Sequence, residues 1–166
     1  MSRRSLPAFL FAALAGTGAA PAFADGSDPA CKPVIDADKA RAAAPAWHAK
    51  KTMGGMSMEI IRLGNDVYAD MGGTGWKQMP PPMAANIVNA GNQADQFTVS
   101  DCRKLGDETI NGVATTLWSF KTKVKDLAPI TGKVWIGQRD GLPYREEGEK
   151  HAGTTTYQGV AAPKLK

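Results

Sequence analysis

Methionine and histidine side chains supply the softest metal ligands in this sequence. Met53, Met56 and Met58 stand close together, and His48 shortly precedes them. Thioether sulfur suits Cu(I), and imidazole also binds copper. The alternation of Met56 and Met58 is equally typical of a strand with one apolar face, because methionine fills irregular apolar spaces. We therefore expect no metal centre here, with copper binding by these four residues as the alternative.

Aromatic and methionine side chains could together line an apolar pocket. An indole ring gives a large apolar surface with one N–H that can orient a ligand. Pockets for small molecules are mostly apolar and hold only a few polar groups. The alternative is that these side chains only close the core. The candidate ligand-binding residues are Met56, Met58, Met71, Trp76, Trp118, Phe120 and Trp135.

Catalytic side chains do not form a recognisable set. The two histidines, His48 and His151, lie far apart in the sequence, although Asp36 or Asp38 could orient His48 as a base. The sequence contains no H-E-x-x-H, no G-x-S-x-G and no glycine-rich phosphate loop. We therefore predict that the protein is not an enzyme and carries no cofactor.

The N-terminus carries the three-part pattern of a secretory signal peptide. Two arginines give a charged start, an apolar run spans 6–20, and Ala22 and Ala24 place small residues before a cleavage site. The apolar run is shorter than the ~20 residues that cross a bilayer, and proline and glycine interrupt it. We predict a signal peptide over 1–24, cleavage after Ala24, and export to the periplasm by the Sec or the twin-arginine route. No transmembrane segment is expected after processing.

Charge and cysteine content bear on the expected partners and on a disulfide. The formal net charge is +4. It falls to about +2 without the two arginines of the signal, and no long Lys/Arg run remains to bind a polyanion. We therefore expect no nucleic-acid partner. The sequence has two cysteines, and an even count in an oxidising compartment predicts a disulfide between Cys31 and Cys102.

Alternating apolar residues and turn dipeptides predict an antiparallel β protein. Short helices are expected over 36–44 and 83–90, because alanine favours a helix and proline or glycine ends each segment. Strands do not alternate with helices, so the fold class is mainly β with minor α. We expect a curved antiparallel sheet, an incomplete barrel, covered by one or two short helices. The predicted strands span 56–63, 66–71, 76–79, 96–104, 113–124, 132–138, 142–149 and 154–160.

Several local patterns occur in an order that resembles a known family. They are Glu59-Ile60-Ile61, Tyr68, Gly75-Trp76, Gly132-Lys133-Val134-Trp135-Ile136, Asp140-Gly141-Leu142-Pro143 and Arg145. Their order and spacing are similar to those of the periplasmic lipoprotein-carrier superfamily, the LolA-like and LolB-like proteins, over residues 47–163. The resemblance implies a half-barrel whose open side is covered by helices. It also implies that the concave face holds an acyl chain or a hydrophobic protein segment.

The resemblance and the export signal together give the expected organisation. We expect an N-terminal arm over 25–35 and a single LolA-like β domain over 36–166. The expected function is that of a soluble periplasmic protein that binds a hydrophobic ligand, namely an acyl chain, lipid or lipoprotein segment. Two alternatives stay open: copper binding through the methionine and histidine set, and a cell-envelope interaction module that binds another envelope protein and no small ligand.

Overall fold

A computed structural model of the chain describes residues 28–89, 97–124 and 128–166. The predicted signal peptide over 1–24 and its cleavage site lie outside the described residues. Within these ranges, no helix is long and apolar enough to span a membrane.

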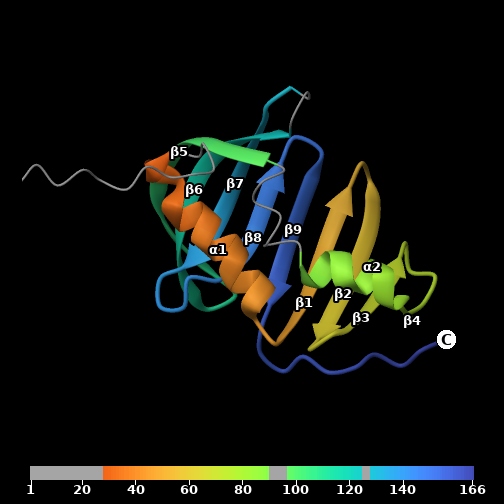
Figure 1. The fold of residues 1–166 in the computed structure, drawn as a ribbon. Helices are drawn as coiled ribbons and strands as arrows, with labels where there is room; N and C mark the ends of the chain where they lie inside the picture. The colour runs from red at the N-terminus through yellow and green to blue at the C-terminus, as the bar shows by residue number, and fades with distance from the viewer. Residues whose placement is uncertain (1–27, 90–96, 125–127) are drawn as a thin grey trace, which may run out of the picture.

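The described residues form nine β-strands in one antiparallel sheet (Figure 1). The order across the sheet is β4-β3-β2-β1-β9-β8-β7-β6-β5, so the first and last strands of the chain lie side by side in the middle. β4 and β5 form the two edges, which leaves the sheet curved and open, as predicted. The strands are β1 Ala46–Met53, β2 Met56–Leu63, β3 Asp66–Met71, β4 Lys77–Gln78, β5 Phe97–Ile110, β6 Val113–Val124, β7 Ile130–Gly137, β8 Pro143–Gly148 and β9 His151–Thr156.

Two α-helices of the described chain cover one face of this sheet. α1 (Lys32–Ala43) lies over the half that contains β7 and β8, and α2 (Pro81–Val88) lies beside β3 in the other half (Figure 1). Proline stands in the first turn of both helices, where its missing N–H has no helical partner to lose.

The helix bounds differ from those predicted. α1 begins four residues earlier than the predicted helix over 36–44, so the stretch 25–35 is not wholly an arm. It contains a 3₁₀ turn over Pro29–Cys31 and the first residues of α1. The side chain of Asp28 caps the 3₁₀ turn by accepting a hydrogen bond from the backbone N–H of Ala30. α2 likewise begins two residues before the predicted helix over 83–90 and ends at Val88.

Turn chemistry sets the hairpins of the sheet. β2 and β3 match the predicted strands 56–63 and 66–71. Between β5 and β6, Asn111 and Gly112 adopt positive φ angles of 49° and 81°, as a tight hairpin turn requires. β5 continues to Ile110 through a stretch predicted as a connection, and register shifts against β6 absorb its irregularity.

The apolar core lies between the helices and the sheet. The cluster beneath α1 comprises Cys31, Val34, Ala37, Val99, Cys102, Val134 and Ile136, with Ile35, Phe97, Trp118 and Phe120 packed against it. The cluster beside α2 comprises Ala44, Trp47 and Ala49, with Ile60, Ile87, Leu142 and Tyr157 packed against it. Each helix therefore covers its own apolar area of the same sheet face.

A disulfide joins Cys31 to Cys102, which confirms the predicted pair. Cys31 lies at the junction of the 3₁₀ turn and α1, and Cys102 lies in the edge strand β5. Nearby, the backbone N–H of Asp28 donates to the carbonyl of Val99 at 3.3 Å. The N-terminal end of α1 is therefore fastened to one edge of the sheet.

We predict that replacing both cysteines by alanine lowers the unfolding free energy by roughly 4 kcal/mol. The bond links residues 71 positions apart. In the chain-entropy model, a loop of this size restricts the unfolded state by about that amount. Urea unfolding of protein produced in an oxidising compartment measures the change. Treatment of the native protein with a reductant is the control and should give a similar loss, whereas a loss below about 1 kcal/mol would contradict the prediction.

Candidate ligand-binding site

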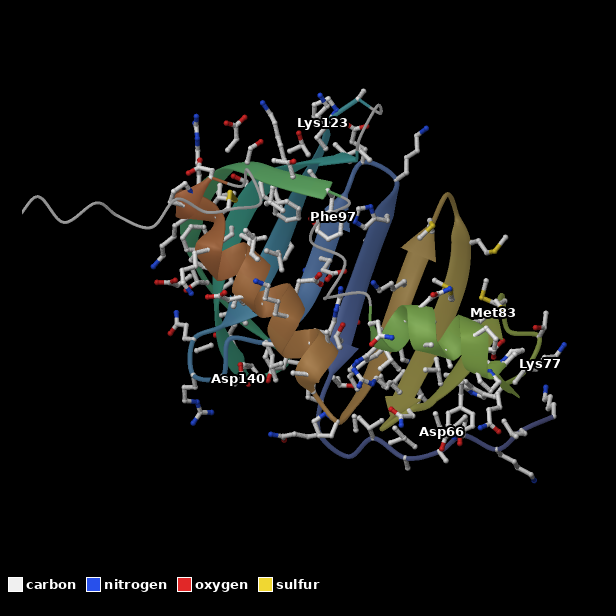
Figure 2. The ribbon with its side chains drawn as sticks, in the orientation of Figure 1. Asp66, Lys77, Met83, Phe97, Lys123 and Asp140 are labelled. Carbon is white, nitrogen blue, oxygen red and sulfur yellow. A yellow bond between two sulfur atoms is a disulfide. The ribbon has the colours of Figure 1, made fainter. Side chains whose placement is uncertain are left out.

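A first cavity, here called the α1 cavity, lies between α1 and the sheet and has a volume of about 260 Å³. Apolar side chains from the helix and from four strands, β5 to β8, form most of its lining. Its polar members include Asp38, Glu146 and His151. The apolar members are Val34, Ile35, Ala37, Phe97, Val99, Phe120, Val134 and Pro143. Figure 2 shows Phe97 in the half of the sheet that α1 covers.

Glycine on β7 sets the position of one aromatic wall. Gly132 is paired with Phe120 across β6 and β7, and a Cβ atom at Gly132 would lie 2.7 Å from the Phe120 ring. The Phe120 ring therefore lies directly over Gly132. Any larger residue at position 132 would displace the ring. Of the predicted ligand-binding residues, Phe120 lines the α1 cavity and Trp118 packs against the cluster beneath α1.

A second cavity, here called the α2 cavity, has a volume of about 270 Å³. It lies where the C-terminal end of α1, the strands β1 and β2, and α2 meet. Its lining residues are Arg41, Ala42, Trp47, Ala49, Lys51, Ile60, Asn86 and Ile87. None of the predicted ligand-binding residues, all within the described part of the chain, lines this cavity.

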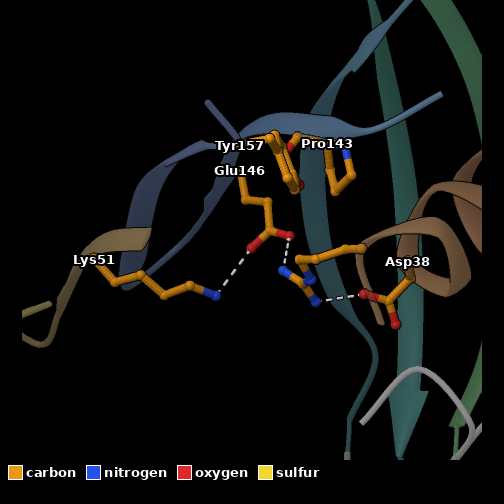
Figure 3. A network of polar contacts seen from close by, with 6 residues as sticks. Asp38, Lys51, Pro143, Glu146 and Tyr157 are labelled. Atoms are coloured by element: carbon orange, nitrogen blue, oxygen red, sulfur yellow. Dashed lines mark hydrogen bonds and ion pairs between the residues drawn. The ribbon is translucent and has the colours of Figure 1, made fainter. Parts of the chain in front are cut away.

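An ion network stands between the two cavities (Figure 3). Arg41 Nη1 donates to Glu146 Oε1 at 2.6 Å, and Lys51 Nζ donates to Glu146 Oε2 at 3.2 Å. Arg41 also donates to the carboxylate of Asp38. Glu146 lines the α1 cavity, whereas Arg41 and Lys51 line the α2 cavity, so the network is a wall that both share.

The cations of this network control the ionisation of Glu146. Burial alone would raise the pKa of Glu146, but the charges of Arg41 and Lys51 outweigh burial and hold the pKa below its usual range. Burial also lowers the pKa of Arg41, yet Glu146 and Asp38 raise it above its ordinary value. Glu146 and Arg41 are therefore both charged near neutral pH. Beside it, burial raises the pKa of Tyr157, whose hydroxyl donates to the carbonyl of Pro143 at 2.8 Å.

This network has no local signature in the sequence. Glu146 stands in the acidic stretch 146–149, which would suit a solvated strand edge, but Arg41 and Lys51 enclose its carboxylate. Its partner Arg41 lies 105 residues away in the chain, and only the packing of α1 against the sheet brings the two together. No local spacing could have revealed the pair.

The predicted methionines share one sheet face but lie at its surface. Met53 is directly opposite Met56, and Met58 is directly opposite Met71, all on the face that carries α2. Met53, Met56 and Met71 are 57%, 59% and 48% exposed, so they are not core residues. Figure 2 shows Met83 of α2 in the same half of the molecule. The linings of the α1 and α2 cavities do not include these methionines among the described residues.

The structure does not bring His48 to these methionines. Strand alternation places His48 on the opposite face from Met53. There its Nε2 lies 2.8 Å from Glu59 Oε2, and its ring stands edge-on to Trp76 at 5.8 Å between centroids. The partner of His48 is therefore Glu59 and not Asp36 or Asp38, and Trp76 belongs to this group rather than to a cavity.

Trp135 also lies apart from the cavities. It alternates with Val134 on β7 and therefore faces the other side of the sheet. Its indole N–H donates to Glu108 Oε2 at 2.8 Å, and the guanidinium of Arg145 stands 4.7 Å from the ring centroid. The predicted ligand-binding residues thus fall into three places: the α1 cavity region, the exposed methionine surface and the opposite face.

We predict that Glu146→Gln destabilises the protein by about 2 kcal/mol at pH 7. The change leaves Arg41 and Lys51 without their counter-charge, but about a quarter of the Glu146 side chain is exposed. The loss should therefore be smaller than the roughly 3–5 kcal/mol of a fully buried pair. Urea unfolding measures it, with Glu147→Gln as the matched control. Glu147 pairs with Arg145 and should lose less than about 1 kcal/mol.

The pH dependence of this difference has a definite sign. The folded pKa of Glu146 lies below its unfolded value of 4.5, so the charged carboxylate stabilises the fold above that value. This contribution disappears as the pH falls through the folded pKa. The native protein and Glu146→Gln should therefore converge in stability below pH 4.5. A difference that stays constant between pH 7 and the acid limit would contradict the ionic role.

Solved structures share this fold. No protein-family model and no curated protein matches the sequence. The chain superposes on the lipoprotein LppX of Mycobacterium tuberculosis with a TM-score of 0.54 and 12% identity, over 81% of this chain and 99% of that one. It superposes on LprF of Mycobacterium bovis with a TM-score of 0.55 and 14% identity, over 84% and 98%. With the open nine-stranded sheet of the described residues, these likenesses confirm the LolA-like fold that the sequence resemblance predicts.

Proposed function

We propose that this protein binds the hydrocarbon part of a lipid, or another hydrophobic ligand, in the α1 cavity without catalysing a reaction. The observation that carries the proposal is the cavity itself, about 260 Å³ of space that is partly open and lined mainly by apolar side chains of α1 and the sheet. Protein interiors are normally close-packed, so a space of this size beneath a helix has the character of a binding site.

The place of action proposed is the periplasm. The pattern over 1–24 is typical of an exported protein, and the Cys31–Cys102 disulfide suits an oxidising compartment. The similar fold of LppX, which is described as a lipoprotein, supports an envelope protein by analogy of fold alone. An acyl chain, a lipid or a lipoprotein segment would each offer the hydrocarbon that the cavity suits.

We predict that Ala37→Leu weakens binding of a fluorescent fatty acid, cis-parinaric acid, about tenfold. Ala37 is 3% exposed and lines the α1 cavity. The added carbons would occupy space equivalent to about two ligand methylenes, and each buried methylene contributes ~0.8 kcal/mol. Fluorescence titration of lipid-stripped protein measures the change.

The matched control for this experiment is Ala43→Leu. Ala43 is the last residue of α1 and is exposed, so the same substitution adds no bulk to the α1 cavity. Its affinity should equal that of the native protein. Absence of binding by the native protein at micromolar probe would overturn the proposed function and would favour an interaction module that docks another envelope protein.

Copper binding is a second candidate, favoured by the register of three strands. Directly opposed residues in an antiparallel sheet have Cβ atoms ~4.5–5.5 Å apart. The pairs Met53–Met56 and Met58–Met71 therefore place four thioethers on one face of the sheet. Thioethers select Cu(I) over harder divalent ions. His48 does not belong to this set, because it lies on the other face.

If this candidate is correct, the native protein should bind Cu(I) under anaerobic conditions in competition with bicinchoninate. The combined Met53→Leu, Met56→Leu and Met58→Leu variant should lose that binding, because leucine keeps the bulk but removes the sulfur. Met79→Leu lies outside the two opposed pairs and is the control. Equal Cu(I) affinity of the native protein and the triple variant would eliminate this candidate.

A further inference from the structure

Trp47 carries a buried polar group that the fold leaves unsatisfied. Its side chain is 6% exposed, and its indole Nε1 has no hydrogen-bond partner among the described residues. A buried donor without an acceptor costs about as much as a lost hydrogen bond, so each one calls for a physical reason. By contrast, the indole N–H of Trp135 is paired with Glu108.

Trp47 forms part of the wall of the α2 cavity. Around it, Ala49 and Ile60 from the sheet and Ile87 from α2 are apolar, whereas Arg41, Lys51 and Asn86 are the polar members of the lining. A cavity of about 270 Å³ with a mainly apolar lining and an unpaired donor on one lining residue has the composition of a small-molecule site, in which a few polar groups orient the ligand. The complement to a lone N–H donor is a ligand oxygen that accepts a hydrogen bond.

The charges around the α2 cavity argue against an anionic ligand. Arg41 and Lys51 also line it, but both donate to the carboxylate of Glu146, and Arg41 donates to Asp38 as well. Two cations therefore face two carboxylates, so no positive charge is left to offset the dehydration of a ligand anion. Burying a charge without a partner is far more costly than burying a hydrogen-bonded neutral group.

We infer that the α2 cavity binds the uncharged carbonyl of an ester or amide, to which Trp47 Nε1 donates a hydrogen bond. The inference goes beyond the proposed function, because it gives the α2 cavity a ligand class of its own, neutral acylated molecules. Nε1 is enclosed in the free protein, so one of the side chains that cover it must move before the carbonyl can reach it. Ile87 is placed for this, because it belongs to the short helix α2, lines the α2 cavity and packs against the cluster that contains Trp47.

Three fluorescent probes separate the carbonyl from the hydrocarbon. Methyl cis-parinarate is a neutral ester, cis-parinaric acid is an anion at neutral pH, and diphenylhexatriene is a hydrocarbon without an acceptor. We expect Trp47→Phe to weaken binding of the ester about fivefold, which is the effect of one net hydrogen bond. The affinity for diphenylhexatriene should not change. The native protein should also bind the ester more tightly than the acid. Trp135→Phe removes an indole on the opposite face and should change none of these affinities.

A spectroscopic measurement keeps the inference testable if Trp47→Phe folds poorly. In ¹⁵N-labelled native protein, the indole N–H resonance of Trp47 should shift on addition of methyl cis-parinarate but not of diphenylhexatriene. An unshifted resonance in the presence of bound ester would overturn the inference. An equal loss of affinity for all three probes in Trp47→Phe would also overturn the inference. Neither of these two results would contradict the proposed function. Failure of every probe to bind would overturn the proposed function as well.

Discussion

The carboxylate of Glu146 ties together three parts of the chain that are distant in sequence. It stands on β8 and accepts hydrogen bonds from Arg41 of α1 and Lys51 of β1. β1 and β8 both flank β9, at the point where the two halves of the sheet meet. The C-terminal end of α1 is therefore held over this junction by charge. Asp38 adds a second carboxylate on α1, so the charges of the network balance.

The opposite end of α1 is held by a covalent bond. Cys31 joins the helix to the edge strand β5, so α1 is attached at both ends by something other than apolar packing. Between these attachments the helix presents Val34 and the small residue Ala37 to the sheet. A helix with larger residues there would fill the space beneath it. The α1 cavity lies beneath a helix that is anchored at both ends as well as packed through these residues.

The two faces of the sheet carry different chemistry. The face beneath the helices holds the two cavities and, beyond α2, the exposed surface of Met53, Met56 and Met71. The opposite face holds paired polar and aromatic groups, such as His48 with Glu59. The two cavities proposed to take apolar ligands both lie on the helix-covered face. The proposals for lipid and for Cu(I) concern separate areas of that face.

The sequence by itself determined the class of fold and the local elements. Alternation set β2 and β3, the Asn111-Gly112 dipeptide set a hairpin turn, and the cysteine count set the disulfide. The strands and the turn depend on neighbouring residues in the chain. The disulfide was predictable because two cysteines allow only one pairing. For the candidate site, the sequence identified Phe120 and Trp118 but placed them in one set with five residues that lie elsewhere.

Tertiary structure alone decided which side chains meet. The face to which Trp135 or His48 points depends on strand register, and the Arg41–Glu146 pair depends on where α1 rests on the sheet. The unpaired N–H of Trp47 likewise becomes visible only once every neighbour is placed. The physical reason is that these contacts join residues far apart in sequence, whereas residue types and spacing constrain only the local backbone and its turns.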